Sequence, residues 1–175
     1  MFKTSYKLFR YLIIFIFTFH LSISKAQEFN GNGGNIPDAS FFGPSPWTNF
    51  NINVNSVGTI NCDMTVCINI THPFTDDLDI RLVSPSGTII YLSTDNGGAG
   101  DNYNGTCFTM GANTDITEGF APFTGNYVPE DNLSYLIGEN ANGLWQLQIR
   151  DDDWLFSGSF ISWSIDFTCQ SDCDV

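Results

Sequence analysis

Residues 72–93 have the sequence HPFTDDLDIRLVSPSGTIIYLS, and this stretch decides the fold. Apolar and charged residues alternate from Asp77 to Leu82. A period of two is typical of a β-strand with one buried face and one exposed face. Residues 84–87, Ser-Pro-Ser-Gly, then predict a turn, because proline fixes φ and glycine accepts a positive φ. With a second strand at residues 88–92, the stretch predicts a half-buried hairpin.

The same alternation recurs along the chain between turn residues. It is visible at residues 49–55, 64–72 and 143–151, and in a final strand whose inward side chains are predicted to be Ile161, Trp163, Ile165 and Phe167. No segment has the 3.6-residue period of an amphipathic helix. Short strands at regular intervals predict an all-β fold, an antiparallel β-sandwich of jelly-roll type similar to galactose-binding domains.

Both ends of the chain differ from this pattern. Within residues 1–26, three basic residues precede an apolar run from Tyr11 to Leu21, and small residues follow at 24 and 26, which predicts a secretory signal peptide. Residues 27–35 are rich in glycine and asparagine and are predicted to be a flexible lead-in. Residues 36–169 form the predicted domain, and 170–175 are a tail that suggests missing downstream sequence. We therefore expect a secreted protein, extracellular or on the cell surface, without membrane insertion after cleavage.

The charge of the exported part is strongly negative. Four of the six basic residues lie in residues 1–26. The rest of the chain therefore contains all 19 acidic residues but only two basic ones, Arg81 and Arg150, which gives it a net charge of −17. Such a surface argues against nucleic acid and anionic membranes as partners. It suits cation binding or solubility alone.

Five cysteines follow the predicted signal peptide, and an exported protein allows them to form disulfides. An odd number leaves one free or paired outside the domain. Cys67 lies on the polar face of its strand and Cys107 on a later strand or loop. We favour this pair, although the sequence leaves the connectivity open.

Residues 36–169 resemble the P domain, also called Homo B, which follows the catalytic domain in subtilisin/kexin-like proprotein convertases and in many bacterial proteases. The matching residues occur in the family's order, with mild departures at Asp76 and Ser159. The resemblance implies a non-catalytic module that supports a serine endopeptidase, with a protease or sorting domain as partner in the same or a neighbouring chain. It also implies a structural role for His72, Leu78, Ser84, Pro85, Gly87, Gly143, Trp145, Gly158 and Trp163.

Catalysis by the domain itself is not expected. A serine-protease triad needs a nucleophile, a histidine base and an orienting acid. His72 is the one histidine after residue 26, and it lies within the structural motif. The chain also lacks a Gly-x-Ser-x-Gly nucleophile elbow.

Two kinds of ligand remain as hypotheses. Calcium prefers six to eight oxygen ligands, several of them from carboxylates, and three acidic loops offer such ligands. The candidate ligands are Asp77, Asp79, Asp101, Asn102, Asp151 and Asp152. The alternative function is a carbohydrate-binding module, for which exposed aromatic residues such as Tyr103, Tyr127 and Trp154 would bind a glycan.

Overall fold

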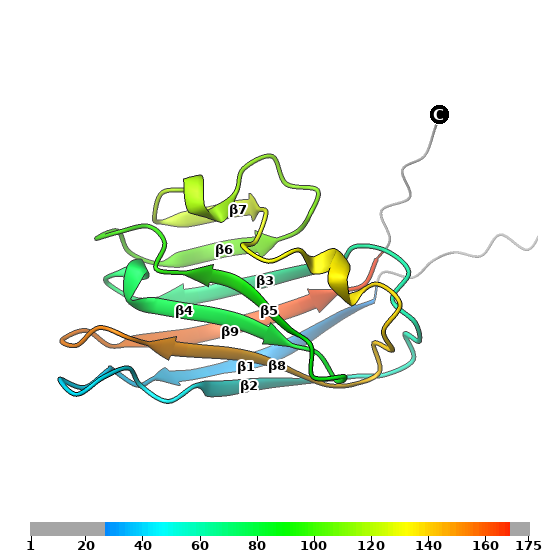
Figure 1. Cartoon of the computed structure of the whole chain (residues 1–175), viewed down its shortest axis with the longest axis horizontal. Helices are drawn as coiled ribbons and strands as arrows, with labels where there is room; N and C mark the ends of the chain where they lie inside the picture. The colour runs from blue at the N-terminus through cyan, green and yellow to red at the C-terminus, as the bar shows by residue number, and fades with distance from the viewer. Residues whose placement is uncertain (1–26, 169–175) are drawn as a thin grey trace, which may run out of the picture.

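The computed structural model describes residues 27–168, so the predicted signal peptide and tail lie outside the described residues. Within them, strands form two sheets that pack face to face (Figure 1). The all-β sandwich predicted from the sequence is confirmed. The strands are β1 (Glu28–Ile36), β2 (Thr48–Val54), β3 (Thr65–Thr71), β4 (Leu78–Val83), β5 (Ile89–Thr94), β6 (Tyr103–Phe108), β7 (Phe123–Tyr127), β8 (Gly143–Asp151) and β9 (Gly158–Asp166). Three short 3-10 helices join them: η1 (Thr75–Asp77), η2 (Ile116–Glu118) and η3 (Leu133–Leu136).

One sheet has the strand order β1-β9-β3-β6-β7 and the other β2-β8-β4-β5. The predicted hairpin is the β4–β5 pair, in which Leu82 lies opposite Ile90. The strand pairs within the two sheets are antiparallel except β6–β7 at one edge, which is parallel. The long connection through η2 returns β7 in the same direction as β6. Within residues 27–168, no helix is long and apolar enough to cross a membrane.

The core lies between the two sheets and contains both tryptophans expected there. Trp145 on β8 and Trp163 on β9 are 0% and 2% exposed, and they come from opposite sheets. Trp145 Nε1 donates a hydrogen bond to the carbonyl oxygen of Ala141 at 2.8 Å, so the indole is buried with its polar atom satisfied.

The glycine-rich segment 27–35 is a strand, so the predicted flexible lead-in is wrong. β1 pairs with β9 in continuous register from Glu28 opposite Asp166 to Ile36 opposite Gly158. The glycines of β1 allow it to pack closely against β9. A Cβ atom on Gly33 would collide with the Phe160 carbonyl, and one on Gly31 would collide with the Trp163 indole. Glycine here allows β1 to lie directly against β9, which composition alone does not distinguish from a linker.

The two ends of the described chain lie side by side. Glu28 is opposite Asp166, and the Phe167 amide donates a hydrogen bond to the Gln27 carbonyl. In Figure 1 this end of the sandwich is on the right, while β4 begins and β5 and β8 end on the left.

The final strand departs from its predicted phase. Trp163 and Ile165 point inward as expected, but Ile161 is 56% exposed and Phe160 is buried in its place. Phe167, also predicted inward, follows the end of β9 and is half-buried. A register shift between β3 and β9 at Asn69/Ile70 inserts one residue into β9 and reverses the alternation.

The residues that carry the family resemblance lie in two structural clusters. Ser84 donates a hydrogen bond from its hydroxyl to Glu139 at 2.7 Å and accepts from the amides of Ser86 and Thr88. Gly87 has φ +90°, as the turn requires, and a Cβ atom on Gly143 would press against Pro85. In the second cluster Gly158 lies against the His72 imidazole and leaves no room for a Cβ. Leu78, from the same sequence motif as His72, is fully buried.

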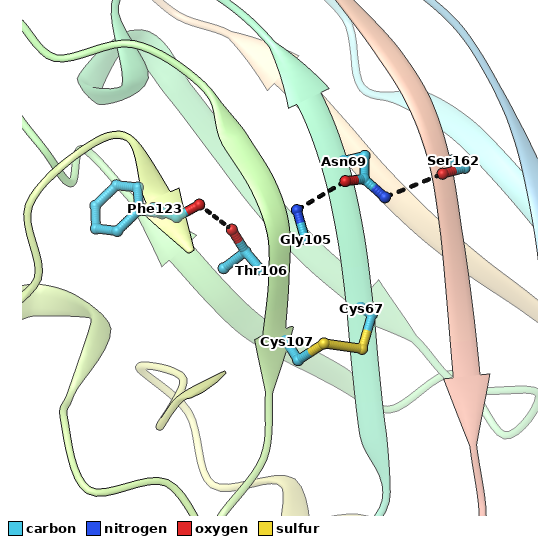
Figure 2. The surroundings of a disulfide bond; sticks show 7 residues. All are labelled: Cys67, Asn69, Gly105, Thr106, Cys107, Phe123 and Ser162. Atoms are coloured by element: carbon cyan, nitrogen blue, oxygen red, sulfur yellow. Dashed lines mark hydrogen bonds between the residues drawn. A yellow bond between two sulfur atoms is a disulfide. The ribbon is translucent and has the colours of Figure 1, made fainter. Parts of the chain in front are cut away.

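The favoured disulfide is confirmed. Cys67 on β3 and Cys107 on β6 are directly opposite in register and are joined by an S–S bond, with their Cα atoms 4.0 Å apart (Figure 2). Cys62 is also disulfide-bonded.

Candidate metal centre at one end of the sandwich

Strand order brings three carboxylates together at the left end of the four-stranded sheet in Figure 1. Asp79 on β4 is opposite Thr94 of β5 and Arg150 of β8, because β4 lies between these strands. Asp95 directly follows β5, and Asp152 directly follows β8. One oxygen from each of Asp79, Asp95 and Asp152 lies within 4.8 Å of the others. We call these three residues the outer carboxylate group.

The loop that carries Asp95 is held in place by Glu130. The Glu130 carboxylate accepts hydrogen bonds from the Thr94 amide and hydroxyl, both at 2.7 Å, and from Asn96 Nδ2 at 2.5 Å. Asp95 itself has φ +52°, a conformation that few residues other than glycine adopt. The position of Asp95 is therefore fixed by its neighbours.

Burial and mutual repulsion act on this group. The pKa of Asp152 is raised to about 6, first by burial and then by the charges of Asp95 and Asp79. The pKa of Asp95 is raised by the same causes, burial first and then Asp79. The neighbouring carboxylates thus make ionisation of Asp95 and Asp152 less favourable.

One arginine partly balances these charges. Arg150 donates to Asp79 Oδ2 from Nε at 2.6 Å and lies 2.5 Å from it through a terminal nitrogen. The same guanidinium lies 4.6 Å from the ring centroid of Trp47, with Arg81 at 3.9 Å from that centroid. Trp47 therefore stacks with both arginines and helps to hold Arg150 at the carboxylates.

A second group lies deeper and contains a histidine. His72 Nε2 is 3.1 Å from Asp151 Oδ2, and Asp77 completes the group within 4.8 Å. His72 Nδ1 lies 2.5 Å from the Phe74 carbonyl oxygen, and the backbone amide of His72 donates to Asn102 Oδ1 at 3.0 Å. We call His72, Asp77 and Asp151 the inner group.

The inner group connects three segments of the fold, although burial makes ionisation of its carboxylates unfavourable. Burial raises the pKa of Asp151 to about 6, while its hydrogen bond with His72 acts in the opposite direction. The other carboxylate oxygen, Asp151 Oδ1, is buried and makes no hydrogen bond within residues 27–168. Burial also raises the pKa of Asp77, and the charge of Asp76 adds to this effect.

The outer group offers oxygen ligands alone, which is the ligand type that calcium prefers. All its ligands are oxygens, as a hard cation prefers, whereas the inner group includes an imidazole that is already engaged through both nitrogens. The Asp79 side chain is only 7% exposed, and its Oδ1 makes no hydrogen bond to the described residues. Of the carboxylate oxygens in the two groups, the one that is fully buried without a donor is Asp151 Oδ1, in the inner group.

The structure sorts the six predicted metal ligands into three places. Asp79 and Asp152 are in the outer group, and Asp77 and Asp151 are in the inner group. Asp101 and Asn102 belong to neither group, and their role as metal ligands stays a prediction. They lie on the other sheet, before β6. Asp95 was missed because the sequence places it alone in a glycine-rich loop, and only the pairing of β4 with β5 brings it to Asp79.

Exposed aromatic residues surround this end of the sandwich. Phe41 packs edge-to-face on Trp154 with ring centroids 5.7 Å apart, and Phe74 stacks on Phe156 at 4.5 Å. Trp154 is exposed, as the glycan hypothesis requires, whereas Tyr103 is 1% exposed at the start of β6. The expectation that Tyr103 lies exposed in a loop is therefore wrong.

Comparisons with known proteins place these observations among relatives. Residues 62–167 match the family model described as proprotein convertase P-domain. The chain is similar to leupeptin-inactivating enzyme 1 of Streptomyces exfoliatus, with 28% identity over 134 residues that cover 76% of this chain and 24% of that enzyme. Among solved structures it is similar to the serine protease of Aeromonas sobria in complex with its chaperone, with 20% identity, a TM-score of 0.47 and coverage of 81% of this chain and 26% of that one. A structure of the same protease described without the chaperone gives a TM-score of 0.44 at the same identity and coverage. The chain thus spans about a quarter of the length of these relatives.

Proposed function

The chain belongs to the proprotein convertase P-domain family, and from this premise we propose that it is a non-catalytic accessory domain that stabilises an exported serine protease. The match over residues 62–167 carries the proposal. The P domain is the accessory module of subtilisin-like proteases. The chain covers only about a quarter of the length of the relatives that it matches. We therefore place the catalytic part of such a protease outside residues 62–167.

The environment of His72 supports the absence of catalysis. A general base must reach the proton that it removes, within about 3 Å or through one water. His72 is the one histidine in residues 27–168; it is fully buried, and both ring nitrogens face groups of the fold. We expect the purified protein to cleave neither casein nor peptides with basic cleavage sites.

A domain replacement tests the accessory role. In the Streptomyces enzyme, the matching region is replaced by residues 27–168 of this chain, and leupeptin inactivation is followed after heating. We expect the chimera to keep its activity longer than an enzyme with the region deleted. Equal rates of inactivation of the chimera and of the deletion variant would contradict the proposal.

We further propose that calcium binds the outer carboxylate group and stabilises the domain. The carrying observation is the convergence of Asp79, Asp95 and Asp152, whose charges are only partly balanced by Arg150. Calcium would be held by these three side chains, and it would remove their repulsion and connect the ends of β4, β5 and β8. A ligand that binds only the folded state stabilises it by about 2.7 kcal/mol at a hundredfold excess over Kd.

Thermal unfolding with calcium, magnesium or a chelator tests this site. Calcium at millimolar concentration should raise Tm, and magnesium should raise it less because it demands octahedral geometry. Asp95→Asn should abolish most of the calcium-dependent shift, whereas Asp101→Asn should retain it. Equal small shifts with both ions in all variants would indicate charge screening and contradict a specific site.

A further inference from the structure

A groove lies on the outer face of the five-stranded sheet, and Asn102 in its lining accepts a hydrogen bond from the His72 amide. It has a volume of about 560 Å³ and is formed where β3, β6 and β9 run side by side. Its lining combines apolar residues with the polar residues Asn69, Thr71, Asp101, Asn102, Asn104 and Ser162. This size is within the range of small-ligand sites in proteins.

Two irregularities in the sheet produce this groove. β3 shifts register at Ile70 with respect to both neighbours. Against β9 the shift leaves Ile161 as an extra residue, and against β6 it leaves Asn104 and Gly105 without direct partners. Bulges redirect side chains and are common beside binding sites. Here they turn the Ile161 side chain outward on β9, and Asn104 lies on β6, the other neighbour of β3.

Hydrogen bonds and a disulfide connect the strands at the floor of the groove. Asn69 is one of the lining residues; its Oδ1 accepts from the Gly105 amide at 2.7 Å and its Nδ2 donates to Ser162 Oγ at 3.2 Å, as Figure 2 shows. One side chain therefore connects three strands across both bulges. The Cys67–Cys107 disulfide fixes β3 to β6 two residues away. A preformed floor reduces the entropy lost on binding.

The walls carry polar groups that the fold does not use. The side chains of Thr71, Asp101 and Asn104 are exposed and make no hydrogen bonds to the described residues. Beside them, Ile161 and Pro122 offer an apolar surface. A carboxylate, an amide and a hydroxyl next to an apolar ledge match a sugar ring, which has hydroxyls at its edge and C–H groups on its face.

We propose that this groove binds a neutral, hydroxyl-rich glycan. The net charge of the chain disfavours anionic polysaccharides and nucleic acids. An extended peptide binds most readily at a sheet edge, where unpaired backbone groups are available, whereas this groove lies on the face of paired strands. The inference is independent of the accessory role and of calcium, because it uses different residues on the other sheet.

Binding of the full secreted chain to an array of neutral oligosaccharides tests the inference, with anionic glycans and lysine-rich peptides on the same array. Neutral ligands that bind are then titrated by calorimetry with a chelator present. We expect saturable binding to at least one class of neutral sugar. Asp101→Ala and Ile161→Ser should each weaken it by about tenfold or more, as expected for loss of a charge-assisted hydrogen bond or an apolar contact.

Two control variants separate the groove from the rest of the surface. Glu118→Ala removes another exposed carboxylate, and Trp154→Ala removes the exposed aromatic residue at the end of the sandwich; both should bind like the unmodified protein. Urea unfolding confirms that each variant is folded. The inference is overturned if no neutral sugar binds, if only anionic glycans or peptides bind, or if the groove variants bind as well as the controls.

Discussion

At the scale of single residues, burial decides how the acidic charges of this protein affect its stability. Asp151 and Asp152 are consecutive, and burial raises the pKa of each to about 6, well above the ordinary value of 3.8. The folded state therefore holds protons that the unfolded chain releases. Their contribution to stability is fully present below about pH 4 and is lost as the pH rises through about 6.

The first prediction follows from this sign. Without calcium, the urea midpoint of the protein should rise when the pH is lowered from 7.5 to 5. Asp152→Asn removes one of the two groups, so its midpoint should change less over the same range. A flat profile for the unmodified protein, or an equal slope for the variant, would argue against raised pKa values at these positions.

A second residue-scale prediction concerns the core. Trp145→Ala should lower the free energy of unfolding by about 3–5 kcal/mol, because it leaves a large cavity between the sheets. Trp154→Ala, at an exposed position, should change it by less than about 0.5 kcal/mol. Equilibrium urea unfolding measures both, and similar values for the two would mean that Trp145 is not a core residue.

At the scale of elements, alternation predicted the strands that have one polar face and one apolar face. β2, β3 and β8 follow the pattern along their length, and β4 departs from it at the buried Asp79. It failed at β1, where glycines replace inward side chains, and at Ile161, where a bulge reverses the phase. Pairing between distant strands causes both differences, and periodicity within one segment does not contain that information.

β1 provides a direct test of this difference between a strand and a linker. Gly33→Ala should destabilise the protein by about 1–3 kcal/mol, because the added methyl group meets the backbone of β9. In a flexible lead-in, the same change would be neutral. Asn32→Ala in the same strand adds no such clash and serves as the control, with urea unfolding as the measurement.

The disulfide between β3 and β6 gives a second element-scale prediction. It closes a loop whose cysteines are 40 positions apart. Replacing both Cys67 and Cys107 by alanine should lower the stability by about 2–4 kcal/mol, since the unfolded chain regains the entropy of that loop. An unchanged urea midpoint would show that the loop is already constrained in the unfolded state.

At the scale of the whole molecule, the sequence predicted the fold class and the acidic character but not which loops meet. Four of the predicted metal ligands do lie at one end of the sandwich, yet they divide between two groups. The division follows from the order β8-β4-β5, which sets Asp152, Asp79 and Asp95 side by side. Strand order is a property of the assembled sheet, so spacing along the chain did not reveal it.

Net charge leads to a prediction at the same scale. With 19 acidic residues against two basic ones after residue 26, the calcium-free protein should be destabilised by self-repulsion. Sodium chloride at 0.5 M shortens the range of this repulsion to a few ångströms, so Tm should rise compared with 10 mM salt. A fall in Tm would instead mean that the Arg150–Asp79 attraction outweighs the repulsion.

The adjacent ends of the described chain determine how the domain responds to mechanical force. β1 is the first strand of the described residues and β9 is the last. The two are antiparallel, so β1 begins at the side of the sandwich where β9 ends (Figure 1). A pull applied between residues 27 and 168 would load the hydrogen bonds of this pair one after another, starting at Glu28 and Asp166. Such unzipping needs much less force than shearing a whole strand at once. The domain should therefore extend easily when it is stretched through its own ends, and resist better when the load enters through the opposite, acidic end.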